Sequence, residues 1–346
     1  MSETVKVGIY GAGWVSGEHL RAYLGNPHCE VVAVGSRRLS SAQRLCQEHG
    51  VEADCCDDFE RFLATPGLTA VSITGPNHVH AEQTIAAARA GKHVLIEKPV
   101  AVDRASLYAM RDAVRAAGVR SVASFVLRWN PLFSTIRALL AREAIGTLVY
   151  AEVDYWHEIG PWWTGYEWAR TKASGGSAFL TGGCHAVDAL RYFVQDEVVE
   201  VAAYAATAAP TEFEYPPTVV AVVKFAGGAV GKVSVSFEAW LPYQFNIDLL
   251  GTAGAIRDNR VFSRELLPGA TDFATVPTTL PNSGEVTHHP FQGEIDHFID
   301  CIRTGVESHV NLEDAVKTHE VCLAIDRAVA EGGPIRLPAE NRRVVG

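Results

Sequence analysis

The chain has 346 residues, of which 48% are hydrophobic and 20% are charged, and its formal net charge is −10. The length exceeds that of one ordinary domain, so we expect two domains with the composition of a globular protein. The negative charge, the lack of a Lys/Arg block and the lack of an apolar run of about 18 residues argue against nucleic-acid binding and against a membrane span.

The N-terminal residues 1–6 enter an apolar strand pattern without a basic leader or a cleavage site, so we expect a cytoplasmic protein. The seven cysteines are an odd number and none has metal-ligand spacing, and Cys55 and Cys56 are adjacent. We therefore expect reduced thiols and no metal site. His288 and His289 have no third ligand near them in the sequence and are interpreted as part of an ordinary loop.

The first third of the chain alternates short β-branched runs with helical stretches, which is typical of βαβ units and a parallel sheet. Strands are expected over 5–10, 30–34, 68–74, 93–96 and 119–126. Helices are expected up to residue 24 and over 40–49, 81–90 and 105–117. With about six strands, this part has the size of a full dinucleotide-binding fold.

Beyond Asn130-Pro131 the pattern changes to alternating stretches over 148–156, 219–225, 230–237 and 245–250, with Gly227-Gly228 as a hairpin turn. Helices over 292–303 and 313–331 and a short strand over 335–337 end the chain. We predict an α/β protein with a doubly wound Rossmann domain over 1–125. A substrate-binding α+β domain over 126–346 is expected to carry a large, open-faced, mostly antiparallel sheet. The open face favours a homodimer or homotetramer.

A glycine-rich string, Gly11-Ala12-Gly13-Trp14-Val15-Ser16-Gly17, lies between the first strand and the first helix. Glycines at this place let backbone amides approach a pyrophosphate at the N-terminus of a helix. Ser16 occupies the position of the usual third glycine, and Gly17 follows it. We interpret residues 11–15 as the cofactor cradle, and the alternative is a purely structural turn.

The end of the second expected strand bears on the choice of cofactor. Dinucleotide-binding domains that select NAD usually place a carboxylate there, but this chain has Ser36, Arg37 and Arg38. Serine and arginine can bind a 2′-phosphate that a carboxylate would repel. NADP(H) is therefore favoured, with NAD(H) as the alternative, and the two arginines could also be simply solvated.

Several motifs together resemble the Gfo/Idh/MocA family of oxidoreductases, which includes glucose-fructose oxidoreductase and inositol dehydrogenase. They are the glycine loop, Thr74-Gly75-Pro76-Asn77-His78-Val79-His80, Glu97-Lys98-Pro99, Gly175-Gly176-Ser177 and His185-Ala186-Val187-Asp188. The resemblance implies that Thr74, Pro76, Asn77, His80 and Glu97 belong to the cofactor site. It also implies that Lys98 lies at the nicotinamide, before a cis Lys98–Pro99 bond.

Hydride transfer from an alcohol asks for residues of this kind. A lysine stabilises developing alkoxide charge and a neutral histidine accepts the hydroxyl proton, which assigns Lys98 and His185 as catalytic. Many relatives have an aspartate four residues before the histidine. This chain has Thr181 there, which carries no charge but can hydrogen-bond a substrate hydroxyl, so Thr181 is a substrate candidate. Asp188 would orient the His185 imidazole, or it simply packs the helix.

Four of the seven tryptophans fall between Tyr155 and Arg170, immediately before the segment of His185. Flat aromatic faces beside polar groups suit a sugar ring, so His157, Trp163 and Trp168 are substrate candidates. A subunit contact or a core would use the same residue types. Arg128 matches a position that often faces the active site in relatives, and it is a further substrate candidate.

We therefore expect an NAD(P)-dependent dehydrogenase acting on a secondary hydroxyl of a sugar, sugar derivative or cyclitol. Two alternatives are a non-catalytic dinucleotide-binding regulator and a glycoside-cleaving enzyme that uses bound nicotinamide transiently. A sensor has no need of both Lys98 and His185, which argues against the regulator.

Overall fold

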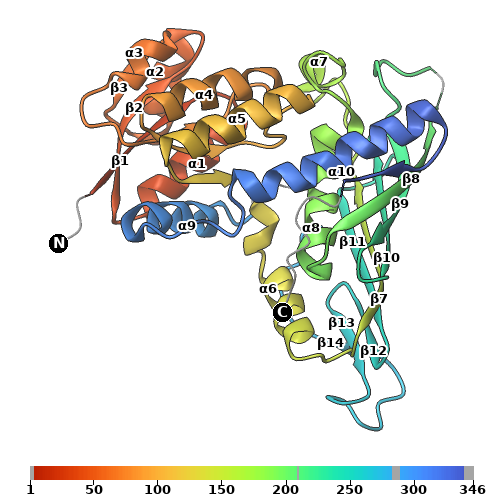
Figure 1. Ribbon diagram of the computed structural model, residues 1–346. Coiled ribbons are helices and arrows are strands. Elements are labelled where there is room, and N and C mark those ends of the chain that lie inside the picture. Colours follow the sequence, from red (N-terminus) through yellow and green to blue (C-terminus); the bar gives the residue numbers. More distant parts are fainter. Residues whose placement is uncertain (1–3, 209, 283–288, 339–346) are drawn as a thin grey trace. The chain divides into compact units, whose positions relative to one another are not determined.

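The computed structural model describes residues 4–208, 210–282 and 289–338 (Figure 1). The chain forms two compact units. The first contains residues 1–126 and 290–317, and the second contains residues 127–289 and 318–346. The first unit's N-terminal part ends one residue beyond the expected boundary at 125, and residues 290–317, expected in the second domain, are assigned to the first unit. No helix of the described residues combines the length and the apolarity that crossing a bilayer requires.

The first unit is built on a six-stranded parallel sheet in the order β3-β2-β1-β4-β5-β6. Its strands are β1 (Val5–Tyr10), β2 (Cys29–Gly35), β3 (Asp54–Cys56), β4 (Ala70–Ile73), β5 (His93–Ile96) and β6 (Ser121–Ala123). Its helices are α1 (Trp14–Gly25), α2 (Leu39–His49), α3 (Phe59–Leu63), η1 (Asn77–Val79), α4 (His80–Arg89), α5 (Arg104–Ala117) and α9 (Phe291–Thr304). This strand order is that of a Rossmann fold, as expected.

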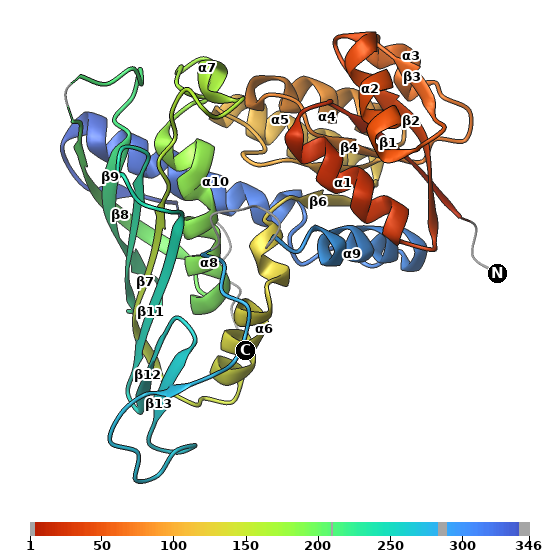
Figure 2. The ribbon, with the colours of Figure 1, turned by 180° about the vertical axis from the view of Figure 1, so that it is seen from behind.

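Two layers of helix cover this sheet. Helices α4 and α5 contact each other and lie in front of the sheet in Figure 1, whereas α1 lies in front in Figure 2. Helix α9 packs on α1, through contacts such as the Gln292 side-chain amide donating to the Ala22 carbonyl at 3.1 Å. The strands β4 and β5 are buried almost throughout because both faces are covered, which explains their continuous apolar runs.

The second unit is built on a nine-stranded sheet in the order β14-β13-β12-β11-β7-β10-β9-β8-β15. Its strands are β7 (Leu148–Trp156), β8 (Val198–Ala206), β9 (Thr218–Phe225), β10 (Val230–Ser236), β11 (Gln244–Gly251), β12 (Gly254–Arg257), β13 (Arg260–Ser263), β14 (Ala274–Thr275) and β15 (Ile335–Arg336). The expected hairpin at Gly227-Gly228 joins β9 and β10, with Gly228 at a φ of 98°. The pairing of β10 with β7 is parallel and all other pairings are antiparallel, so the sheet is mixed.

The two faces of this sheet differ. Helix α8 (Cys184–Val194) packs on β7 and β10 and buries their alternate residues, and α6 (Pro131–Ala141) packs on α8. The opposite face carries exposed apolar side chains, namely Tyr204, Val220, Val222, Val230 and Leu250. Ion pairs such as Lys232–Asp154 and Lys224–Glu200 lie on the same face. The expected open face is therefore present, with charge pairs set among apolar residues.

The remaining helices are short or shared between the units. They are η2 (Val126–Trp129), α7 (Tyr166–Ala169), the π-helical turn η3 (Phe179–Gly183) and α10 (Leu312–Glu331). Helix α10 contains residues assigned to both units.

Candidate functional site

The glycine-rich loop connects β1 to the N-terminus of α1, as expected. Gly11 has a φ of 137°, in the region that favours glycine, and a Cβ there would collide with Thr74. Gly13 caps α1 without a side-chain hydrogen bond, the first turn has no acidic residue, and a Cβ on Gly13 would meet open space. Residues 11–15 therefore leave the first amides of α1 open to an anion, which fits a pyrophosphate.

Ser16 shows how the chain manages without the usual third glycine. Its side chain is fully buried, and its hydroxyl lies 2.9 Å from the hydroxyl of Thr74. Thr74 in turn donates to the Tyr10 carbonyl at 3.2 Å. A glycine at this position would allow α1 to pack closely on the sheet because it has no side chain. Ser16 instead holds α1 close to the sheet through this hydrogen bond.

The residues after β2 form the positively charged segment without a carboxylate that the sequence predicts. Ser36 is half-buried, and Arg37 and Arg38 are exposed and form no ion pair with any residue in the described ranges. No carboxylate ends β2. The loop thus offers two guanidinium groups for a phosphate.

The loop after β4 contains a buried amide that lacks a partner. Asn77 is 4% exposed, and its Nδ2 has no hydrogen-bond acceptor among the residues that the structure describes. An unsatisfied buried donor at the carboxyl end of a parallel strand fits a bound dinucleotide. Pro76 precedes this asparagine as the cap of η1.

His80 is buried, and both of its ring nitrogens face backbone carbonyl oxygens of the protein. Its Nδ1 lies 2.7 Å from the Pro99 carbonyl oxygen, and its Nε2 lies 2.8 Å from the Gly75 carbonyl oxygen. Burial lowers the pKa of this imidazole despite the two backbone bonds. The histidine ties the loop after β4 to the loop after β5, so any contribution to cofactor binding is made through the position of these loops.

Lys98 follows β5 and is half-buried, and the Lys98–Pro99 peptide bond is cis, as expected. The preceding Glu97 is buried and points into the domain. One of its oxygens accepts from His19 Nε2 at 3.0 Å and from Ser124 Oγ at 2.9 Å, and the other accepts from the backbone N–H of Lys98 at 3.1 Å. Burial raises the pKa of Glu97, but the bonds from His19 and Ser124 and the charge of Lys98 outweigh it and leave the pKa below its usual value.

A second carboxyl, that of Glu294 in α9, belongs to the same hydrogen-bond network as Glu97. The sequence had not indicated it. Ser124 Oγ lies 3.0 Å from Glu294 Oε2 as well as 2.9 Å from Glu97 Oε1. A serine hydroxyl has one proton, so it cannot donate to two carboxylates at once. Burial and the nearby charge of Glu97 raise the pKa of Glu294 well above its usual value. Protonated Glu294 therefore donates to Ser124, which donates to Glu97 and so supports the segment of Lys98.

In the second unit, His185 lies in the first turn of α8 and is 5% exposed. The π-helical turn η3 leads directly into it, a form of backbone often found at functional sites. Thr181, within η3, donates its hydroxyl to the Gly175 carbonyl at 2.8 Å. The residue that replaces the usual aspartate is thus used to hold the Gly-Gly-Ser loop.

Arg128 and Asp188 form a buried ion pair. Arg128 Nε and Nη2 lie 2.8 and 2.6 Å from the two carboxylate oxygens of Asp188, and Thr318 donates to the same carboxylate at 3.2 Å. Both charged side chains are under 5% exposed. Arg128 was expected at the substrate, and Asp188 was expected to orient His185 or to pack the helix. The structure brings the two together, and the carboxylate of Asp188 neutralises the charge of Arg128.

Aromatic rings gather around His185 within the second unit. The ring of Tyr155 stacks on His185 at 6.2 Å, and Tyr243 meets Tyr155 edge-to-face at 5.3 Å and His157 at 5.4 Å. His289, which lies in the loop before α9 as expected, has its ring 6.4 Å from that of His185 and so belongs to this cluster. His288, the other half of that histidine pair, lies outside the described residues.

Tyr243 has an unusual hydroxyl group. The side chain is 5% exposed, and no described residue offers a hydrogen-bond partner to its oxygen. Burial, with a smaller contribution from Tyr155, raises its pKa well above the usual value, so the group remains an O–H donor. Sequence reasoning missed Tyr243 because no motif surrounds it.

Of the other expected substrate residues, His157 belongs to this cluster, and Trp163 and Trp168 form a separate pair. His157 contacts the ring of Trp162 at 5.9 Å, and the Trp162 indole donates to Glu158 at 3.0 Å. Trp163 and Trp168 contact each other at 5.5 Å and are both partly exposed. Among the described residues, no group of three or more His, Cys, Asp or Glu side chains is placed to hold a metal ion.

Comparison with known families identifies both parts of the chain. Residues 5–125 match the family described as "Oxidoreductase family, NAD-binding Rossmann fold", and residues 133–257 match the "GFO/IDH/MocA C-terminal domain".

Several characterised proteins are similar over nearly the whole length. The scyllo-inositol 2-dehydrogenase (NAD(+)) of Bacillus subtilis (strain 168) is 25% identical, and the alignment covers 99% of this chain and 98% of that protein. The 1,5-anhydro-D-fructose reductase of Ensifer adhaerens is 26% identical, with coverage of 94% and 96%.

A solved structure, "Levoglucosan dehydrogenase, complex with NADH", superposes with a TM-score of 0.88 at 24% identity and covers 96% of this chain and 99% of its own. At this identity the likeness shows the fold.

Proposed function

The chain belongs to the GFO/IDH/MocA family of NAD-binding oxidoreductases, and on this basis we propose that it oxidises a secondary hydroxyl of a sugar, sugar derivative or cyclitol, or reduces the corresponding ketone. The observation that carries the proposal is that the chain retains both Lys98 and His185. A protein that only sensed a dinucleotide would need neither a cation after β5 nor a buried histidine at the start of α8.

The two residues have complementary roles. The nicotinamide supplies the site that takes up or gives the hydride. Lys98 stabilises the negative charge that develops on the hydroxyl oxygen as its proton leaves, and the neutral imidazole of His185 accepts that proton. Protonated Glu294, Ser124 and Glu97 hold the backbone of Lys98 by the hydrogen bonds described above.

The aromatic cluster supports a carbohydrate or cyclitol as the substrate. Tyr155, His157 and Tyr243 present ring faces and edges, and the Tyr243 hydroxyl is a buried donor with no described acceptor. A ligand with several hydroxyl groups satisfies such a donor, whereas a purely apolar ligand leaves it unsatisfied at a cost of about 1–3 kcal/mol. This favours a polyhydroxylated ring.

For the cofactor, we propose a preference for NADP(H) over NAD(H). The exposed guanidinium groups of Arg37 and Arg38 make no ion pair in the described structure, and no carboxylate ends β2. Both features suit the 2′-phosphate that distinguishes NADP(H). NAD(H) binding remains within the capacity of the same loop because the pyrophosphate cradle at 11–15 serves both.

We also propose that the exposed face of the second unit's sheet is the interface between subunits of a homodimer or homotetramer. Val220, Val222 and Leu250 lie on this face, each more than 40% exposed. Exposed apolar rows on a wide sheet are typical of subunit interfaces. Light scattering of Val222→Glu, which places a charge in the row, should show a smaller particle than the unchanged protein.

The deciding experiment is nicotinamide reduction by the purified protein across a panel of sugars and cyclitols, with NADP⁺ and NAD⁺ side by side. Turnover with any member supports the dehydrogenase, and a higher kcat/KM with NADP⁺ supports the proposed preference. Cofactor binding without turnover would favour the non-catalytic regulator. A glycoside-cleaving enzyme would instead release sugar with no net reduction of the nicotinamide.

A further inference from the structure

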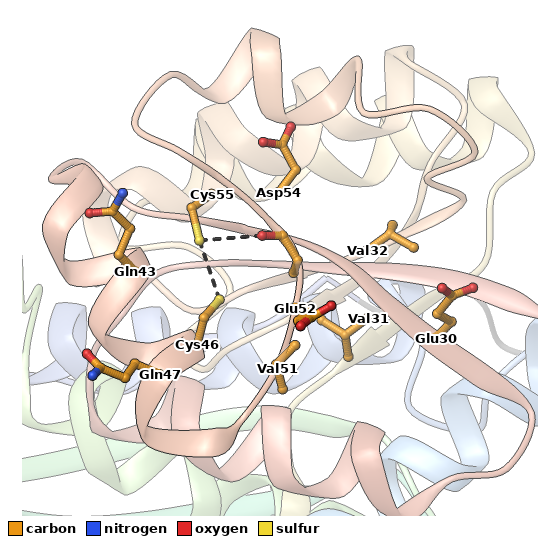
Figure 3. A pocket seen from close by; sticks show the side chains of 11 residues that line it. Glu30, Val31, Val32, Gln43, Cys46, Gln47, Val51, Glu52, Asp54 and Cys55 are labelled. Atoms are coloured by element: carbon orange, nitrogen blue, oxygen red, sulfur yellow. Dashed lines mark hydrogen bonds between the residues drawn. The ribbon is translucent and has the colours of Figure 1, made fainter.

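A surface pocket of about 740 Å³ lies at one edge of the first unit's sheet, and two cysteines line it (Figure 3). Its walls come from the first half of β2, the second half of α2 and the segment leading into β3. The lining includes Glu30, Gln43, Cys46, Glu52 and Cys55. Nothing in the proposed hydride transfer uses this pocket.

The two thiols are in contact. The sulfur atoms of Cys46 and Cys55 are 3.4 Å apart, and Cys55 Sγ also lies 3.7 Å from the Ala53 carbonyl oxygen. A disulfide bond is about 2.05 Å long, so the sulfurs would need to approach by about 1.4 Å. The adjacent Cys56 is fully buried because neighbouring residues of a strand point to opposite faces. Of the two adjacent cysteines, only Cys55 therefore has a partner thiol in the pocket.

We propose that Cys46 and Cys55 form a modification site at which hydrogen peroxide produces an intrachain disulfide. In the first step the Cys55 thiol attacks the peroxide, becomes a sulfenic acid and releases one water. In the second step the Cys46 sulfur attacks the Cys55 sulfur, the S–S bond forms and a second water leaves. The two thiols lose two electrons and two protons in total, and the peroxide is reduced to two waters.

The order of the two steps follows from exposure. Cys55 is half-buried and faces the pocket, whereas Cys46 is 6% exposed. Burial, followed by the hydrogen bond to Cys55, raises the pKa of the Cys46 thiol to about 12. Cys46 is thus a poor first nucleophile towards an oxidant in solution, but it is correctly placed to resolve a sulfenic acid on Cys55.

The charge of the pocket indicates which oxidant it admits. Glu30, Glu52 and Asp54 are its charged lining residues, and no lysine or arginine is among them. A neutral molecule enters such a site freely, whereas anionic disulfides such as oxidised glutathione are repelled. This favours hydrogen peroxide as the reagent.

The bond would join the last turns of α2 to β3, at the opposite end of α2 from Arg38. We therefore expect oxidation to leave cofactor affinity within about twofold, since the phosphate-facing loop lies before the first turn of the helix.

The test treats the full-length reduced protein with hydrogen peroxide, blocks the remaining thiols with N-ethylmaleimide and digests with trypsin. Peptide 45–61, between Arg44 and Arg61, contains Cys46, Cys55 and Cys56. The expected product carries one maleimide and has lost two hydrogens, and cleavage after Glu52 leaves its two halves joined. Cys29, half-buried on peptide 22–37, is the internal reference and should oxidise at least about tenfold more slowly.

Variants then separate the thiols. Cys55→Ala should abolish the disulfide, and Cys56→Ala should retain it. Cys46→Ala should leave a sulfenic acid at Cys55 that dimedone traps. Three maleimides on peptide 45–61 after treatment, oxidation of Cys29 at the same rate, or a bond that survives Cys55→Ala would each overturn the proposal.

Discussion

Replacing Tyr243 by phenylalanine should make the protein more stable and its substrate binding weaker at the same time. The substitution removes only the hydroxyl, which is buried without a described hydrogen-bond partner, and it keeps the ring contacts with Tyr155 and His157. An unsatisfied buried polar group costs about 1–3 kcal/mol, so the free energy of unfolding should rise by about 1 kcal/mol. Loss of one hydrogen bond to substrate, worth about 1.4 kcal/mol, should raise KM about tenfold with a smaller change in kcat.

The matched control is Tyr23→Phe in the first unit. Tyr23 is 1% exposed, and its hydroxyl lies 2.7 Å from Ser72 Oγ, so the same substitution there removes a satisfied hydrogen bond. It should lower the free energy of unfolding by about 1–2 kcal/mol. Urea unfolding and steady-state kinetics measure both quantities. If Tyr243→Phe is destabilising like the control, its hydroxyl has a partner, and if KM is unchanged, the group does not touch substrate.

Four further outcomes are expected. Lys98→Ala should lower kcat by at least about 100-fold with cofactor affinity nearly unchanged by fluorescence titration, and near-normal turnover would remove Lys98 from the chemistry. Arg37→Ala should weaken NADP(H) about tenfold and NAD(H) little, whereas equal losses would contradict the proposed preference. Burial, against the opposing effects of Ser177 and Lys172, raises the pKa of Asp326 to about 7, above its unfolded value, so its stabilising contribution is complete below pH 4 and is lost as pH rises through 7. In the unchanged protein, Asp326 should therefore lower the free energy of unfolding by up to about 4 kcal/mol between pH 4 and pH 8, as measured by urea unfolding. The Asp326→Asn variant should lack this fall, and a pH profile identical to that of the unchanged protein would refute the assignment. Glu294→Gln, which mimics the protonated acid, should keep kcat within about twofold, whereas a large loss would mean that Glu294 acts as a carboxylate.

The first unit could be predicted well because its signals are local. Strand β5 has the predicted bounds, and β1 lies where the apolar run before Gly11 indicated. Strand β3 was missed because three residues, Asp54–Cys56, are too short to show a period. Helix α9 was predicted as a helix, but its membership of the first unit depends on contacts far apart in the sequence.

In the second unit the strands with alternating β-branched residues were found, and others were not. Strand β8 (Val198–Ala206) contains several alanines, which have a weak strand preference, and it was missed. The parallel pairing of β7 with β10 could not be inferred because these strands are not neighbours in the chain.

In the candidate site too, residues within motifs could be predicted, whereas those defined by contacts distant in the sequence could not. The resemblance pointed to Lys98, the glycine loop and His185, each within a motif. The spacing of Asp188 from His185 left two roles open, orienting the imidazole or packing the helix, and it could not reveal the bond to Arg128, sixty positions away in the chain. Tyr243 and Glu294 have no motif, and only their burial and their hydrogen-bonding state draw attention to them.

The return of α9 to the first unit has a consequence for synthesis of the protein. Ile295, Phe298 and Ile299 are fully buried, and α9 covers α1. Residues 127–289 must be translated before this helix exists, which takes on the order of ten to thirty seconds at roughly 5–20 residues per second. During that interval the nascent N-terminal sheet exposes the apolar surface of α1. Ribosome-stalled chains that end before residue 290 should therefore be protease-sensitive and engage chaperones, whereas chains that extend beyond α9 should not.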